Sequence, residues 1–531
     1  MRYRIAAVAA LATAALAGAG CNDSKFLTEV PYDFVGPANF YRNANDALAA
    51  VNGVYASFVA TSGSQYYGGE FVMLAEYPTE MMTPYLSAGN ERSQVDNYTF
   101  NPAHNYIYHT WQHAYSAINR ANSVIDRVPA VEMDTTLRNR VVGEARFLRA
   151  LHYFNLVRLF GGVPIYASET AGLDSLERPR SNAADVYALI ISDLEQAAAV
   201  LPKGSTYGST NVGRASRGAA KTLLAKALIQ RAATGIGTTA DYQAALGLLQ
   251  DVEANEGYTL LANYADLFDM KHENNSEVIF DIQATRAPGL GERLSSQCAP
   301  RKSNYGSSQN GSFTAEQPFF DQYTTADKRR PTTWQLTFVD KSNTIVSWTT
   351  TASASGAYGA DAPYMRKCLD SLSTGDDEQN FIILRYADNL LMKAEAINEI
   401  SGPTAEAYAA VNAVRTRAGL PALVAGLAQP AFKDSLFAQR RLEMTFEGPN
   451  GFFDSQRHWA WASARIRSAM NLGLANRFRN SKYPKANPFC PAGATTCADV
   501  SPIPDKFKLF PIPQKAMDLN PLLRDQQNPG W

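Results

Sequence analysis

The dominant pattern in this sequence is a series of long segments whose apolar residues recur at helical spacing, mostly in pairs. The expected helices cover Tyr108–Val128, Val141–Phe160, Ala184–Leu201, Ser216–Ala233, Asp241–Glu253, Ile383–Ile400, Thr404–Ala418 and Ala431–Phe446. Several of them are apolar on more than one side, which is typical of helices that stack on neighbours. Helix pairs of this size resemble tetratricopeptide units, which bury their faces only by stacking. The sequence therefore predicts a mostly α-helical protein.

The size and composition of the chain limit its class. With 531 residues it exceeds what one compact core usually supports, so several subdomains or a solenoid-like body are expected. A hydrophobic content of 46% excludes wholesale disorder. Lysine and arginine total 49 against 50 acidic residues, so no excess positive charge is present to hold a phosphate backbone. Nucleic acid is therefore not expected as a partner.

The N-terminus has the features of an export signal. The basic start Met1–Arg4 precedes an apolar run, Ile5–Ala19, that is too short to span a bilayer. Small residues then lead into Cys21, which favours a lipoprotein signal peptide over residues 1–20 and acylation of Cys21, for example with palmitate. Residues 21–48 would then form the lipid anchor and tether. An ordinary signal-peptidase site within the same small residues is the alternative.

The remaining cysteines point to disulfides in an exported protein. The chain has 5 cysteines, and setting Cys21 aside leaves an even number. Cys490 and Cys497 flank a short loop that a local disulfide would close, which leaves Cys298 to pair with Cys368. Free thiols are the alternative. No Cys-x-x-Cys pair indicates zinc or a redox centre.

Two stretches interrupt the helical pattern. Residues 60–106 are rich in glycine, tyrosine and polar residues, and residues 284–380 are rich in glycine, serine, threonine and aromatics. Long irregular segments inserted into a rigid body are where binding functions usually lie. The sequence thus predicts a helical body that carries a loop-rich binding region.

The sequence carries no catalytic signature. A Gly-x-Ser-x-Gly elbow, a P-loop, a dinucleotide-binding glycine motif and an EF-hand are all absent. His109 and His113 are spaced for one helical face, but the glutamate of a His-Glu-x-x-His motif is missing and no third ligand can be named. We therefore expect packing or surface histidines, no metal, no cofactor and no enzymatic activity.

The C-terminus carries the most specific motifs, Leu509–Gln514, Leu519–Leu523 and Gln527–Trp531. Further segments belong with them: Phe40–Tyr55, Glu144–Pro164, Gly218–Ala227, Leu384–Ala396 and Asn412–Gly419. Together they resemble the SusD/RagB family of outer-membrane nutrient-binding lipoproteins. On this resemblance, residues 49–270 form an N-terminal helical region. Residues 271–531 form a C-terminal region with the loop-rich insertion at about 284–380.

The resemblance implies a fold and a function. Family members have four tetratricopeptide-like helix pairs and a more irregular ligand-binding half. They capture oligosaccharides, or in some cases peptides, at the cell surface and pass them to a SusC-like TonB-dependent transporter; they are not enzymes. We therefore expect a lipid-anchored, glycan-binding protein of the outer membrane. A peptide-binding member, a purely structural scaffold and a hydrolase are the alternatives.

Candidate ligand-binding residues follow from the chemistry of sugars. Sugar rings stack on aromatic side chains, and their hydroxyls need amide, carboxylate or guanidinium partners. The resemblance places binding platforms in loops of the two irregular stretches. The candidates there are Tyr66, Tyr67, Tyr85, Asn90, Arg92, Asp96, Tyr98, Tyr305, Trp334, Trp348 and Tyr358. They are chosen by region and residue type alone, and ordinary packing is the alternative for each aromatic ring.

Overall fold

The computed structural model describes residues 40–59, 66–84, 91–170, 172, 176–287, 289–291, 293–306, 308–349, 362–373, 375–472 and 503–531. Several residues singled out above lie outside this part of the chain: Cys21, Tyr85, Asn90, Tyr358, Cys490 and Cys497.

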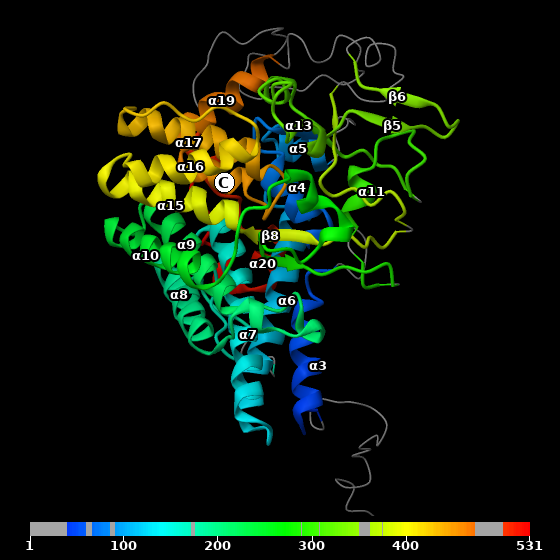
Figure 1. The fold of residues 1–531 in the computed structure, drawn as a ribbon. Coiled ribbons are helices and arrows are strands. Elements are labelled where there is room, and N and C mark those ends of the chain that lie inside the picture. The colour runs from blue at the N-terminus through cyan, green and yellow to red at the C-terminus, as the bar shows by residue number, and fades with distance from the viewer. Residues whose placement is uncertain are drawn as a thin grey trace, which may run out of the picture.

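Long helices stack in sequence order on one side of the molecule (Figure 1). The stack contains α6 (Asn105–Arg127), α7 (Thr135–Phe160), α8 (Ala183–Val200), α9 (Arg217–Ala233), α10 (Thr239–Asn255), α15 (Tyr386–Ser401), α16 (Ala405–Arg417) and α17 (Gln429–Met444). Because α10 packs directly on α15, the chain leaves the stack after α10 and rejoins it at α15. The mostly helical fold predicted from the sequence is confirmed. Within the described residues, no helix combines the length and apolarity needed to cross a bilayer.

Local sequence explains where these helices begin and end. Asp134 and Ser216 cap α7 and α9, since each side chain accepts a hydrogen bond from a backbone N–H in the first turn. Helix α7 ends at Gly161, whose φ of 72° suits glycine, and α15 ends at Gly402 with a φ of 80°. The glycine and proline punctuation in the sequence therefore marks these helix ends correctly.

One predicted helix is wrong at its start. Residues 383–385 belong to strand β8 (Phe381–Arg385), which pairs antiparallel with β2 (Val278–Ile282), and α15 begins only at Tyr386. All of β8 is buried. A short apolar run that is covered on both faces has no alternation, so periodicity alone cannot separate a strand from a helix.

The first irregular stretch holds more structure than expected. After α3 (Ala44–Tyr55), it contains α4 (Glu70–Glu76), β1 (Met82–Pro84) and α5 (Glu91–Asp96). Every residue of α4 is buried. A helix that is covered on all sides has no amphipathic pattern, which is why the sequence did not reveal it.

The insertion between α10 and α15 forms small sheets and short helices opposite the stack (Figure 1). A four-stranded antiparallel sheet has the order β1-β3-β7-β4, with β3 at Phe313–Ala315, β7 at Tyr364–Met365 and β4 at Trp334–Gln335. Strands β5 (Thr337–Val339) and β6 (Ile345–Ser347) form a separate hairpin. The short helices of this half are α11 (Leu294–Cys298), α12 (Gln317–Phe320) and α13 (Arg330–Thr333).

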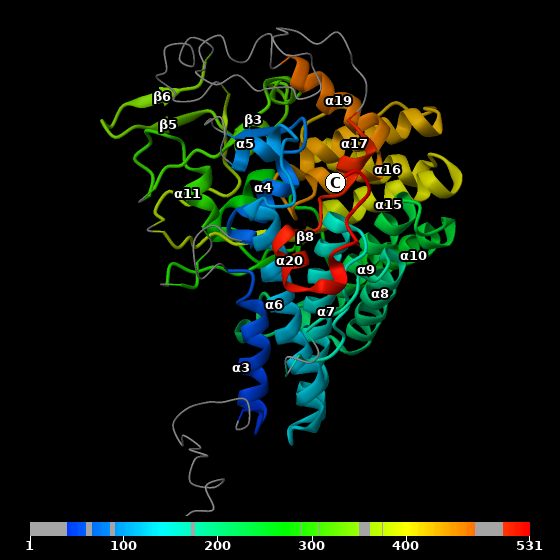
Figure 2. The same ribbon diagram turned by 180° about the vertical axis from the view of Figure 1, so that it is seen from behind.

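The C-terminal motifs pack on the end of α7. Helices α18 (Gly451–Arg457), α19 (Trp459–Leu472) and α20 (Gln514–Leu519) follow the stack, and in Figure 2 the red terminal segment lies in front of α6 and α7. The Phe510 N–H donates to the Leu159 carbonyl, and Asn528 Nδ2 donates to the Phe160 carbonyl. Two separate sequence motifs thus meet in one structural contact.

A buried cluster of charges joins the insertion to the helical stack. This junction cluster contains Arg329, Lys367, Arg385 and Arg417 as cations and Glu277, Asp327, Glu443 and Glu447 as anions. No side chain in it is more than 4% exposed. Equal numbers of opposite charges neutralise one another, as buried ions require.

Candidate functional site

The two irregular stretches meet in the four-stranded sheet. Strand β1 from the first stretch pairs with β3 from the second, with Met82 opposite Ala315. Arg92 of α5 reinforces this contact, because its guanidinium donates to Ser312 Oγ at 2.6 Å and to Gln297 Oε1 at 3.2 Å. Arg92 therefore ties the two stretches together, and a role in fixing the loops accounts for its position.

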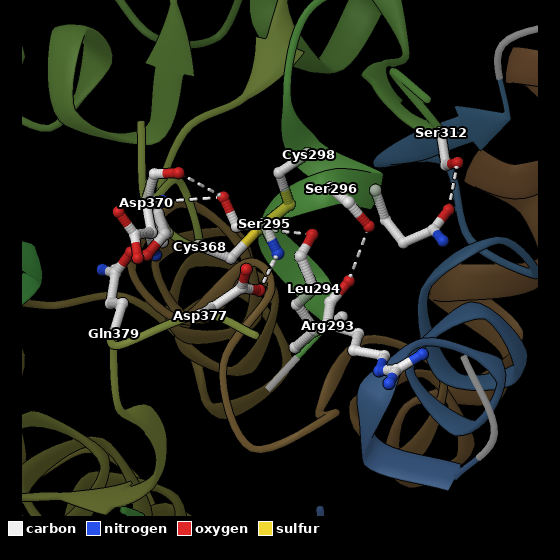
Figure 3. Close-up of a disulfide and its surroundings, with 12 residues drawn as sticks. Arg293, Leu294, Ser295, Ser296, Cys298, Ser312, Cys368, Asp370, Asp377 and Gln379 are labelled. Carbon is white, nitrogen blue, oxygen red and sulfur yellow. Dashed lines mark hydrogen bonds between the residues drawn. A yellow bond between two sulfur atoms is a disulfide. The ribbon is translucent and has the colours of Figure 1, made fainter. Parts of the chain in front are cut away.

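A disulfide holds the insertion together. Cys298 at the end of α11 is bonded to Cys368, with the two Cα atoms 6.3 Å apart (Figure 3). Beside it, the Asp370 N–H donates to Ser295 Oγ at 2.8 Å, and Ser295 Oγ donates to the Asp370 carbonyl at 2.9 Å. Helix α11 and the segment 366–373 are thus joined by one covalent bond and a reciprocal pair of hydrogen bonds.

Two aspartates beside the disulfide have opposite electrostatic environments. Burial raises the pKa of Asp377 to about 7, and its Oδ2 accepts from the Ser295 N–H at 2.6 Å. Burial also raises the pKa of Asp370, but the hydrogen bonds and charge of Arg286 and the N–H groups of Glu378 and Leu372 together outweigh burial, so this pKa is lowered. A fixed anion at Asp370 therefore anchors Arg286 to this loop.

Tyr66 and Tyr67 are each only 1% exposed. Asn155 Nδ2 of α7 donates to both hydroxyls, at 3.2 Å and 2.8 Å, and the Tyr66 hydroxyl lies 2.7 Å from His152 Nδ1. Both rings pack against helix α7 in the core. The structure leaves neither ring with a face on which a sugar could stack.

Tyr98, Asp96 and Trp334 are also buried. The Tyr98 hydroxyl donates to the Pro78 carbonyl at 2.7 Å, and Asp96 Oδ2 accepts from Thr83 at 3.2 Å. Trp334 is 0% exposed and lies among the rings of α12 and its flanking residue Tyr323. Asp96 and Trp334 therefore support strands β1 and β4 from within, whereas Tyr98 packs on Phe100 and Phe507.

Tyr305 and Trp348 are the two described aromatic candidates that remain half-buried, and the structure brings them together. Both pack on the buried pair Phe338 and Tyr364, which belong to β5 and β7. The Trp348 ring also meets Phe320 edge to face, with centroids 4.9 Å apart. The side of the insertion that carries the β5–β6 hairpin therefore presents two partly accessible rings on a common base.

Phe338 and Tyr364, which form this base, were not among the residues expected from the sequence. The turn of the β5–β6 hairpin has a cue in the sequence, because aspartate favours turns. In the structure, Asp340 Oδ1 accepts hydrogen bonds from the N–H groups of Ser342 and Thr344. Asn343 there has a φ of 59°, a conformation that asparagine tolerates. These local cues predict a turn, but not which rings would pack beneath it.

The two histidines on α6 have partners within the protein. His109 Nδ1 lies 2.9 Å from Glu70 Oε2, and the His113 ring stacks near Tyr66 at 6.3 Å. Burial lowers the pKa of His113 and raises that of Glu70. In the part of the chain that the structure describes, no three histidine, cysteine, aspartate or glutamate side chains gather as metal ligands.

Two buried carboxyls, Asp281 and Asp377, and one half-buried carboxyl, Glu273, make stability depend on pH in this half. Burial raises the pKa of Asp281 to about 6, and those of Glu273 and Asp377 to about 7. The folded protein therefore keeps protons that the unfolded chain loses above about pH 4, so stability falls as the pH rises from 4 to 7. Up to pH 6, we expect the unfolding free energy of Asp281→Asn to fall with pH less steeply than that of the unmodified protein, by roughly 1 kcal/mol per pH unit. Urea unfolding at several pH values measures it, and an unchanged slope would contradict the assignment.

Comparisons with known proteins agree with this architecture. The sequence model of the SusD family matches residues 233–531, and a model described as starch-binding and associating with the outer membrane matches residues 49–229. SusD-like protein P2 of Formosa agariphila is 27% identical over 485 residues, covering 84% of this chain and 88% of that protein. The crystal structure of a SusD homolog from Bacteroides thetaiotaomicron has a TM-score of 0.78 at 25% identity, over 93% of this chain and 98% of the other. A laminarin-binding SusD-like protein has a TM-score of 0.71 at 23% identity, over 92% of this chain and 100% of the other.

Proposed function

The chain belongs to the SusD family, and on this premise we propose that it captures oligosaccharides at the cell surface. It acts as a nutrient-binding lipoprotein of the outer membrane and delivers its ligand to a SusC-like TonB-dependent transporter. Capture is non-catalytic and uses no cofactor. The matching family description of association with the outer membrane and the predicted acylation of Cys21 support this location. Purification of the protein without any associated barrel would contradict the transporter partnership.

The observation that carries the proposal is the pair of half-buried rings, Tyr305 and Trp348, on one base. Sugar rings present C–H faces that pack on aromatic rings, and two such contacts are needed to give even weak capture. The disulfide and Arg92 hold the surrounding loops, which lowers the entropy lost on binding.

A related fold with a known ligand also supports the proposal. One structural relative is described as a laminarin-binding SusD-like protein. Laminarin is therefore included among the polysaccharides to be tested. Tyr85 and Asn90, which lie outside the described residues, stay candidates by residue type.

Replacing Tyr305 or Trp348 by alanine should weaken glycan binding about fivefold each, and the double variant roughly thirtyfold, at about 1 kcal/mol per stacking contact. Native affinity electrophoresis of the protein without residues 1–21, against plant and microbial polysaccharides, measures this. Trp531→Ala is the matched control, because Trp531 is also half-buried but packs on Phe100 and Phe507. Its binding should equal that of the unmodified protein.

The other outcomes separate the alternatives. Glycan binding that survives in the double variant would keep the function but remove these two residues from the site. Binding of oligopeptides without any glycan would favour the peptide-binding alternative. Indifference to every tested ligand would favour a structural scaffold, and turnover of a polysaccharide would favour a hydrolase.

A further inference from the structure

A two-lobed pocket lies between the end of α3, the connection from α8 to α9, and strand β2. One lobe has a volume of about 470 Å³ and the other about 320 Å³. The two lobes share Val212–Arg214 and Phe280–Asp281 in their walls, so they adjoin each other. None of the glycan-binding candidates named above lines either lobe. The pocket is therefore separate from the surface around Tyr305 and Trp348.

The larger lobe, here the apolar lobe, presents mainly hydrocarbon. Its apolar lining includes Tyr55, Phe58, Val59, Val212, Phe280 and Ile282. Polar groups in its wall are already occupied: Arg214 donates to Glu144 Oε2 at 2.7 Å and to Asn52 Oδ1 at 2.8 Å. Asp281 accepts from Asn380 at 3.0 Å. With these groups satisfied internally, the lobe favours an apolar ligand group.

The smaller lobe, here the polar lobe, contains hydroxyls and a carboxylate. Its polar lining includes Ser205, Tyr207, Ser216, Glu256, Tyr258 and Asn275. Glu256 is 2% exposed, and its Oε1 accepts from Arg217 at 2.8 Å and from Lys221 at 2.9 Å. Its Oε2 is buried and has no hydrogen-bond partner among the described residues. A buried carboxylate oxygen without a donor is costly, so a ligand donor is favoured there.

The charges around Glu256 select a neutral donor. Arg217 and Lys221 already compensate the carboxylate, so a ligand ammonium group would add an uncompensated positive charge. A hydroxyl supplies the missing hydrogen bond without any charge. We propose that this pocket binds a neutral sugar that carries an apolar substituent. The substituent occupies the apolar lobe, and a sugar hydroxyl donates to Glu256 Oε2.

Phenyl glycosides and their two halves test this chemistry. The probes are phenyl β-glucoside and phenyl β-galactoside, the corresponding methyl glycosides, which lack the ring, and anisole, which lacks the sugar. We expect at least one phenyl glycoside to bind at least about tenfold more tightly than its methyl glycoside or anisole, because only it fills both lobes. Titration calorimetry and ligand-observed NMR measure the affinities.

Substitutions of residues that line each lobe test where the probes bind. Ala56 is exposed and lines the apolar lobe, so Ala56→Trp should abolish binding of both anisole and the phenyl glycoside. Ala49→Trp is the matched control, since Ala49 is exposed on α3, about two turns before the Ala56 that follows this helix, and does not line the pocket. Glu256→Gln should weaken the phenyl glycoside about tenfold and leave anisole unchanged. Thermal unfolding of each variant verifies that it is folded.

Four outcomes would overturn the proposal. The first three are equal binding of phenyl and methyl glycosides, undiminished binding by a folded Ala56→Trp variant, and tighter binding of benzylamine, a charged compound tested beside the other probes, than of any phenyl glycoside. The fourth is no binding of any probe. Polysaccharide retention should be unaffected by Ala56→Trp, so failure here and failure of the proposed glycan capture are distinguished.

Discussion

Glu443→Ala is expected to lower the free energy of unfolding by about 3–5 kcal/mol, the cost of breaking a buried ion pair from one side. Glu443 is 0% exposed and accepts hydrogen bonds from Arg329, Arg385 and Arg417. Removing its carboxylate leaves three buried guanidinium groups without their shared anion. Alanine favours the helix at this position of α17, so helix propensity does not explain a loss. Urea unfolding at pH 7 measures the change.

Glu399→Ala is the matched control for this substitution. Glu399 pairs with Lys433 at 2.9 Å, and both side chains are 21% exposed, so its loss should be at most about 1 kcal/mol. If both variants lost a similar free energy of unfolding, burial would not make the ion pairs of the junction cluster stronger than an exposed pair.

The pH dependence gives an independent measure of Glu443. Burial would raise its pKa, but Arg417, Arg385 and Arg329 outweigh burial and hold the pKa well below its usual range. Its stabilising contribution is therefore present above about pH 4.5 and is lost as the pH falls further. The alanine variant should show a flatter loss of stability below pH 4.5 than the unmodified protein. The pH range in which Glu443 changes stability thus lies below the range, up to pH 6, in which Asp281 does so.

The double variant Cys298→Ser/Cys368→Ser is expected to lose about 4 kcal/mol of unfolding free energy. The disulfide joins residues 70 apart, and a cross-link over that length restricts the unfolded chain strongly. Its removal also releases α11 from the segment 366–373. We therefore expect faster amide hydrogen exchange at residues 293–299 and 366–373, together with a lower urea midpoint.

Reduction and a second cysteine pair provide the controls. Reduced, unmodified protein should unfold at the same urea concentration as the double variant. Cys490→Ser/Cys497→Ser removes the predicted local disulfide, which closes a much shorter loop and should cost under about 3 kcal/mol. Exchange in α11 should then stay unchanged. Equal losses from both pairs would contradict the loop-length argument.

The helical stack could be predicted because its signals are local. Apolar spacing, the caps at Asp134 and Ser216, and the glycine at Gly161 act within a few residues of each helix end. Strand β8 and helix α4 could not be predicted in the same way. Both are buried on all sides, so neither carries the polar face that reveals a period.

Residue type does not reveal which of the aromatic candidates are buried and which remain half-buried. Tyr66 and Trp334 are buried, whereas Tyr305 and Trp348 are half-buried, although all four lie in stretches of similar composition. The difference depends on distant partners: Asn155 of α7 covers Tyr66, and the rings of α12 cover Trp334. Burial is a property of what packs on a ring, and spacing along the chain does not encode it.

Local sequence patterns thus determined the order of the stacked helices, several of their ends, the position of the two irregular stretches and the resemblance to the SusD family. The tertiary structure alone decided which rings remain accessible, how Arg92 joins the two stretches, and how the junction cluster balances its charges. In the sequence, Arg385, Arg417 and Glu443 look like ordinary surface charges of amphipathic helices. They become a neutral buried cluster only when segments far apart in the chain meet, because electrostatic pairing and burial depend on distance in space rather than along the chain.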